Sequence, residues 1–130
     1  MLIEKSDFLT QEKRDYINIK LMDYYHKLDN KIFHNIFKTH FLEGAKHSIE
    51  LSSNIILFTY NFYSIDEIIE RIEKSKDEYV KERNEKLQQL KFYNFRQKIQ
   101  LKEEIKGYQQ STVLAVNLLK LVYIKQLAVA

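Results

Sequence analysis

The chain contains no cysteine, proline or tryptophan, and its 130 residues include only two glycines, Gly44 and Gly107. Without cysteine there is no disulfide, no thiol nucleophile and no cysteine-ligated metal, a composition that fits a reducing compartment. Proline and glycine are the residues that most often interrupt helices and form tight turns, so their scarcity leaves few places for long loops. These absences predict long helices joined by very short turns.

The same shortages exclude several kinds of catalytic site. A phosphate-binding loop needs glycines that this chain lacks. The chain has no Gly-x-Ser-x-Gly turn to hold a nucleophilic serine, and its serines fall where helix capping or close packing accounts for them. We therefore predict that the protein is not an enzyme and uses no cofactor.

What the sequence does contain is typical of a folded protein with a small positive charge. Apolar residues make up 45% of the chain, aromatic residues 13% and charged residues 30%, and the formal net charge is +3. Disordered chains contain far fewer apolar residues, so we expect a single helical domain over residues 1–130. The N-terminal residues lack the basic and then apolar pattern of a secretion signal, which favours a cytoplasmic location.

Capping residues and the two glycines divide the chain into four expected helices, at about residues 10–43, 45–63, 65–106 and 111–129. Thr10 is the expected N-cap of the first helix. Ser64 and Glu67 form a capping-box pattern that predicts a helix start at the next residue, Ile65. The segment 54–63 also alternates in polarity and is rich in strand-forming residues, so a β-strand stays open there. We predict an all-α, elongated helical bundle.

Two of the expected helices are difficult to accommodate in a compact monomer. The first carries two apolar faces, one around Leu21 and the other around Ile19 and Met22. The long third helix, at about 65–106, has only a thin apolar stripe, which fits a bundle edge, a helical hairpin or a two-chain coiled coil. A helix that is apolar on two sides usually lies between partners, so we expect a homodimer or a larger homo-oligomer.

The C-terminal segment is the most apolar part of the chain. Of the eighteen residues from Val113 to Ala130, fourteen are apolar, and the polar exceptions lie all around the helix. Such a helix is either the centre of a bundle or a membrane span. Lys120 would lie near the middle of a bilayer at a cost of about 2.5–3.5 kcal/mol. We therefore predict a buried core helix and no membrane partner.

Two groups of basic residues are candidate surfaces for nucleic acid or an acidic protein partner. The first is a narrow lysine stripe on the first helix. The second is the segment 91–102, where basic and aromatic residues alternate as they do where cations meet phosphates and rings stack on bases. An ordinary solvated helix face would give either pattern. The candidate residues are Lys20, Lys27, Lys31 and Lys38 in the stripe, and Lys91, Arg96, Lys98 and Lys102 in the segment.

One set of possible metal ligands also has helical spacing. His40, Glu43 and His47 stand at positions i, i+3 and i+7, and Glu50 continues the row. If the helix passes through Gly44, these side chains share one face and could hold zinc or iron. No second such cluster is present in the sequence, and histidines and acids align by chance on many helices. The pattern therefore favours a structural or surface role.

The sequence as a whole favours a non-enzymatic helical module for protein–protein interaction, such as an adaptor, a regulator or an inhibitor. The alternative is a nucleic-acid-binding accessory protein that uses the lysine stripe and the segment 91–102. A metal-dependent bundle built on His40, Glu43 and His47 is the third hypothesis.

Overall fold

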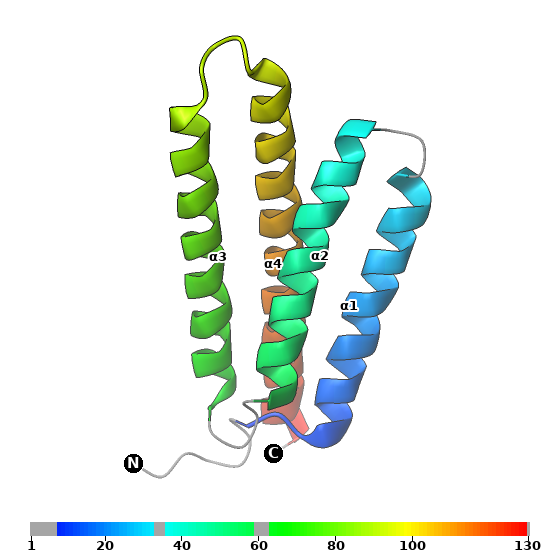
Figure 1. The fold of residues 1–130 in the computed structure, drawn as a ribbon. Helices are drawn as coiled ribbons and strands as arrows, with labels where there is room; N and C mark the ends of the chain where they lie inside the picture. The colour runs from blue at the N-terminus through cyan, green and yellow to red at the C-terminus, as the bar shows by residue number, and fades with distance from the viewer. Residues whose placement is uncertain (1–7, 33–35, 59–62, 130) are drawn as a thin grey trace.

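The described part of the chain forms four helices in alternating directions (Figure 1). The computed structural model describes residues 8–32, 36–58 and 63–129, without the side chains of residues 31–38 and 123–129. These residues contain no β-strand, which confirms the all-α bundle. The helices are α1 (Gln11–Ile32), α2 (Ile36–Phe58), α3 (Ile65–Gln89) and α4 (Phe95–Val129).

The first two predicted helix boundaries were wrong, because the chain does not turn at its glycines. The expected helix 10–43 is divided, since α1 ends at Ile32 and α2 begins at Ile36. Gly44 therefore lies inside α2 rather than at a helix end. The early reversal lets α1 pack against α2, and tertiary packing of this kind supplies most of the stability of helices in proteins.

The expected long helix 65–106 was also wrong. Helix α3 ends at Gln89, Leu90 has an extended backbone, and α4 starts at Phe95 and continues through Gly107. Of the arrangements that fit the thin apolar stripe, the structure has the helical hairpin, with α3 and α4 packed antiparallel (Figure 1). Folding back in this way covers the stripe with residues of the same chain.

Two local predictions are confirmed, and the open choice between helix and strand at 54–63 is answered in part. The Lys13 N–H donates to Thr10 Oγ1 at 3.3 Å, which caps α1. The Glu67 N–H donates to Ser64 Oγ at 3.3 Å, and the Ser64 hydroxyl lies 3.2 Å from the Glu67 carboxylate. In the segment 54–63, residues 54–58 are helical, whereas residues 59–62 lie outside the described part.

The most extensive contact between helices is made by α2 and α4, which run parallel to each other. In Figure 1 this pair lies in the middle of the bundle, with α1 on one side and α3 on the other. In most bundles of alternating helices, the parallel pairs are diagonal and the antiparallel neighbours pack most closely. Here the parallel pair forms the centre of the molecule.

Small residues allow α2 and α4 to approach so closely. A Cβ atom added to Gly44 would lie 1.9 Å from the carbonyl oxygen of Glu104, and one added to Gly107 would lie 1.9 Å from that of Phe41. One helical turn further on, Ser48 Oγ and Thr112 Oγ1 are 2.8 Å apart and buried. The two glycines thus bring backbone against backbone, as small residues do wherever helices pack closely.

Below this crossing the bundle has an apolar core to which all four helices contribute. The C-terminal helix was predicted to be buried on every side, and this is only partly right. Its residues Ala115 and Leu119 are buried, whereas Val113 and Leu121 are 57% and 44% exposed. No helix within the described residues is long and apolar enough to cross a membrane. The buried core residues are Leu9, Ile17, Leu21, Ile49, Ile56, Ile65, Ile68, Ile72, Ala115, Val116, Leu119 and Val122.

Candidate functional site

Three aromatic side chains project from the turn between α3 and α4. Phe92 is 85% exposed, Tyr93 62% and Phe95 64%, and we call these three residues the aromatic tip. The turn is closed by the Asn94 N–H, which donates to the Lys91 carbonyl at 2.9 Å. The rings of Phe92 and Tyr93 meet edge to face, with centroids 5.8 Å apart. An ordered turn therefore holds a large apolar surface in water.

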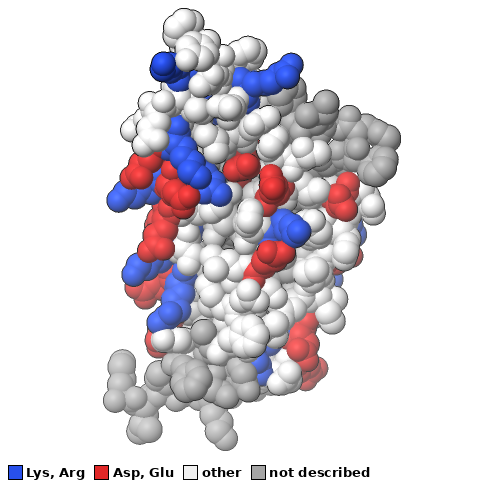
Figure 2. Space-filling model, in the orientation of Figure 1, with Lys and Arg blue, Asp and Glu red and all other residues white. Residues whose placement is uncertain are grey.

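The surroundings of the aromatic tip are entirely basic. Between Glu85 and Glu103 the chain has five basic residues and no acidic one. Figure 2 shows basic side chains, and no acidic ones, over the upper end of the hairpin. Among the predicted residues, Lys91, Arg96 and Lys102 are exposed and Lys98 is half-buried. The five basic residues are Lys86, Lys91, Arg96, Lys98 and Lys102.

The predicted lysine stripe does not lie on one helix. Lys20 and Lys27 are exposed on α1, and Lys27 Nζ pairs with Asp23 Oδ2 at 3.0 Å. Lys31 belongs to α1 and Lys38 to α2, and the side chains of both lie outside the described part. Helix α1 stands on the opposite side of the α2–α4 pair from α3 (Figure 1). Lys20 and Lys27 therefore lie on a different helix from the aromatic tip.

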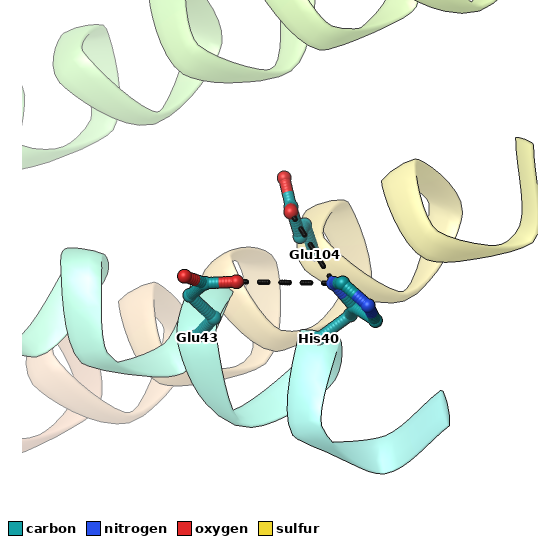
Figure 3. A group of neighbouring side chains, drawn as sticks. All are labelled: His40, Glu43 and Glu104. Carbon is teal, nitrogen blue, oxygen red and sulfur yellow. Dashed lines mark ion pairs between the residues drawn. The ribbon is translucent and has the colours of Figure 1, made fainter. Parts of the chain in front are cut away.

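A polar cluster joins α2, α3 and α4 in the upper half of the bundle (Figure 3). His40 Nδ1 lies 3.8 Å from Glu43 Oε2 and 3.6 Å from Glu104 Oε1. We call these three residues the His40 cluster. From α3, Arg83 Nε donates to the other oxygen of Glu104, Oε2, at 3.3 Å. The guanidinium carbon of Arg83 also lies 4.3 Å from the ring centroid of Tyr79.

The structure brings together two of the three predicted metal ligands and replaces the third. His40 and Glu43 meet because α2 continues through Gly44. His47 is exposed and lies near the Tyr79 ring instead, with centroids 6.2 Å apart. The residue that sequence reasoning missed is Glu104 of α4. Its position could have been predicted only by assuming that Gly44 and Gly107 mark a close contact between two parallel helices. Such a contact places Glu104 beside the helical turn that carries His40.

Behind the cluster, two tyrosine rings stack between α3 and α4. The rings of Tyr79 and Tyr108 are 4.0 Å apart at 14°, and Tyr108 is 3% exposed. Burial, together with the nearby Tyr79 and Glu78, raises the pKa of the Tyr108 phenol to about 12. Burial also raises the pKa of Tyr79, against the opposing effect of the Arg83 charge. Both phenols are thus held in their neutral form.

This pKa shift predicts a loss of stability in alkali. A phenol with a higher pKa in the folded chain stabilises the fold below pH 10 and loses that contribution as the pH rises towards about 12. Tyrosinate absorbance should show a late ionisation step near pH 12, and Tyr108→Phe should reduce this step, leaving the contribution of Tyr79. Tyr93→Phe, at an exposed position, is the control and should leave the late step in place. Ionisation of Tyr108 together with the exposed tyrosines would contradict the prediction.

No protein-family model matches this chain, and neither the search of curated proteins nor the search of solved structures finds a similar protein. Its function is therefore argued from its own surfaces.

Proposed function

We propose that this protein is a non-enzymatic protein–protein interaction module that binds its partner through the aromatic tip. The observation that carries the proposal is the exposure of Phe92, Tyr93 and Phe95 together at the end of one helical hairpin. Single exposed apolar residues are common on protein surfaces, but a contiguous exposed apolar patch usually marks a binding site. A short ordered turn also presents the rings at a small entropic cost.

The aromatic tip has the size to dominate a protein interface. A buried aromatic side chain contributes about 150–250 Å² of surface, and burial is worth about 25 cal/mol per Å² of apolar area. Measured binding energies concentrate in a few aromatic and arginine anchors that fill pockets on the partner. Phe92, Tyr93 and Phe95 fit the role of anchors, with Arg96 beside them.

The basic surroundings define the chemistry of the partner. Five basic residues and no acidic one flank the rings, so the complementary surface is an apolar pocket with an acidic rim. Lys91 and Arg96 would then steer association, and raising the salt concentration should slow it. An adaptor, a regulator or an inhibitor would each use such a contact.

Nucleic-acid binding is the second candidate, and the same lack of acidic residues favours it. Single strands bind to basic grooves in which successive bases stack on aromatic rings. Against it, the three rings gather at one short turn, and Lys20 and Lys27, which could extend a binding track, lie on a different helix, α1. We therefore rank protein binding first.

The experiment compares two triple variants that remove equal numbers of exposed apolar side chains. The first replaces Phe92, Tyr93 and Phe95 of the aromatic tip by serine. The matched control replaces three exposed residues of α1 by serine. Both variants should keep the helical content of the natural protein, and the tip variant should also keep its melting temperature. The control positions are Tyr16, Ile19 and Met22.

A protein that copurifies with the natural chain should remain with the α1 variant and be lost from the tip variant. Calorimetry with that purified partner should show binding at least about 100-fold weaker to the tip variant, the loss expected for anchor residues. Equal binding by both variants would overturn the proposal. A mass shift with a short duplex or a single strand that disappears with salt would favour the nucleic-acid alternative.

We further propose that the protein is a homo-oligomer through the second apolar face of α1. Ile19 and Met22, which define this face in the sequence, are 67% and 44% exposed. Tyr16 lies on the same side, close to Leu121 of α4 across a shallow groove. Light-scattering mass should show a dimer or larger species for the natural chain and a monomer for the α1 triple variant. A monomeric natural chain would overturn this assignment.

A further inference from the structure

We propose that the His40 cluster binds a divalent transition-metal ion, of which Zn²⁺ is the ion to test. His40 and Glu43 come from α2 and Glu104 from α4, and their side chains converge in Figure 3. Each offers one ligand atom, and these three atoms lie within 4.8 Å of one another. A metal held there would link the two central helices above their glycine crossing.

The spacing of the donor atoms is close to that of a metal site. Ligands about 2.0–2.1 Å from a tetrahedral Zn²⁺ stand about 3.3 Å from one another. His40 Nδ1 lies 3.6 Å from the Glu104 oxygen and 3.8 Å from the Glu43 oxygen. The imidazole therefore needs to approach each carboxylate by only a few tenths of an ångström. Rotation of the glutamate side chains would supply that movement and would also bring the two carboxylate oxygens, which lie within 4.8 Å of each other, to the same spacing.

A second, independent observation points to a ligand at this place. The His40 Nδ1 atom is buried and has no hydrogen-bond partner among the described residues. Buried polar atoms in native proteins nearly always have a partner, so an orphaned one calls for an ion or a water molecule. A metal ion bonded to Nδ1 and to the two carboxylates satisfies this atom.

Arg83 helps to position Glu104 for this role. Its Nε holds Glu104 Oε2 at 3.3 Å, which leaves Oε1 directed towards His40. Arg83 is itself stacked on Tyr79, so it acts on Glu104 from α3 without occupying the space between the donors. Hydrogen-bonded partners that orient a ligating carboxylate in this way are common around metal sites.

The donor set selects the class of metal. One imidazole and two carboxylates suit zinc and other first-row dications better than Mg²⁺, which prefers oxygen ligands alone. The Glu43 side chain is 57% exposed, so an ion can enter from solvent and keep water at its remaining positions. Three protein ligands plus water form an open site rather than a closed structural one.

Calorimetric titration of the full chain, freed of metal by a chelator and without an affinity tag, tests the proposal with ZnCl₂ alone. We expect one Zn²⁺ per chain. His40→Gln and Glu104→Gln should each weaken binding by more than about 100-fold, and Arg83→Gln by about 10–100-fold, the range for outer-shell partners. The matched control is His47→Gln, an exposed histidine on the same helix, which should bind zinc like the natural chain.

Helical content and melting temperature without metal show whether each variant is folded. If Glu104→Gln proves unstable, Glu43→Gln at the exposed edge of the cluster serves in its place. A Co²⁺ titration adds a spectroscopic signature, since its visible absorbance depends on coordination number and on the ligands, and His40→Gln should change it.

Two results would overturn the proposal. One is the absence of saturable zinc binding, which would leave His40 as an ion-pair partner of the two carboxylates. The other is binding that His47→Gln removes and Glu104→Gln does not. Neither result involves the aromatic tip, so failure here is distinguishable from failure of the proposed function.

Discussion

Replacing Gly107 by alanine is expected to lower the free energy of unfolding by about 3 kcal/mol, the upper part of the usual range for overpacked interiors. The new methyl group would lie 1.9 Å from the Phe41 carbonyl oxygen and 3.0 Å from the Ala45 backbone nitrogen. Both are main-chain atoms, so no side-chain rotation can relieve the overlap. The α2 and α4 helices must move apart, which disrupts their packing and the buried contact of Ser48 with Thr112.

The sign of this effect distinguishes close packing from an exposed position inside a helix. Within an exposed helix, replacing glycine by alanine raises stability by about 1 kcal/mol, because glycine costs the unfolded chain more entropy on folding. If Gly107 lay on an exposed face of the helix without touching another helix, the substitution would be neutral or stabilising. The structure predicts the opposite sign, because the two glycines face the partner backbone.

Urea unfolding followed by circular dichroism measures the free energy of unfolding of each variant. The control is Gln110→Ala, on the exposed side of α4, whose free energy of unfolding should stay within about 0.5 kcal/mol of that of the natural chain. Gly44→Ala should destabilise comparably, since its added Cβ would also lie 1.9 Å from a carbonyl oxygen. The double variant should cost less than the sum, because the first substitution already separates the helices. A more stable Gly107→Ala protein would contradict the observed crossing.

The two glycines also explain which parts of the fold were predictable. Thr10 and Ser64 were identified correctly because capping is a local interaction, decided within one turn of helix. Glycine is common both at helix ends and inside helices that pack closely against another helix. The residues next to Gly44 and Gly107 in the sequence do not show which of these two roles applies. The i, i+3, i+7 row of Ala45, Ser48 and Ser52 predicts a close approach, but only the fold identifies α4 as the partner.

In the candidate sites too, contacts between residues close in the sequence were predictable, whereas contacts between distant residues were not. His40 and Glu43 are three residues apart on one helix, so helical spacing alone brings them together. Glu104 joins them only through the parallel pairing of α2 with α4, which the sequence does not encode as a motif. The turn before Phe95 contains no glycine or proline, so nothing marked the aromatic tip as a projecting turn rather than a helix face.

Leu119→Ala is expected to cost about 3–4 kcal/mol, because it removes a large side chain from the apolar core and leaves a cavity. Leu119 is 0% exposed and packs in the lower half of the bundle, where all four helices contribute core residues. Leu101, on the same helix, is only half-buried and borders an open groove between α3 and α4. Leu101→Ala should therefore cost only about 1 kcal/mol.

Urea unfolding of both variants measures the difference between the two losses of stability. A larger loss for Leu119→Ala would show that the lower half of the bundle contributes most of the free energy of unfolding. The upper half contains the His40 cluster, the stacked tyrosines and the aromatic tip, and its buried residues Phe41 and Tyr108 lie outside the main apolar cluster. Surfaces that bind partners are often drawn from such less stable regions, which can open locally while the core stays folded. If Leu101→Ala cost as much as Leu119→Ala, the hairpin would be an equal part of the core.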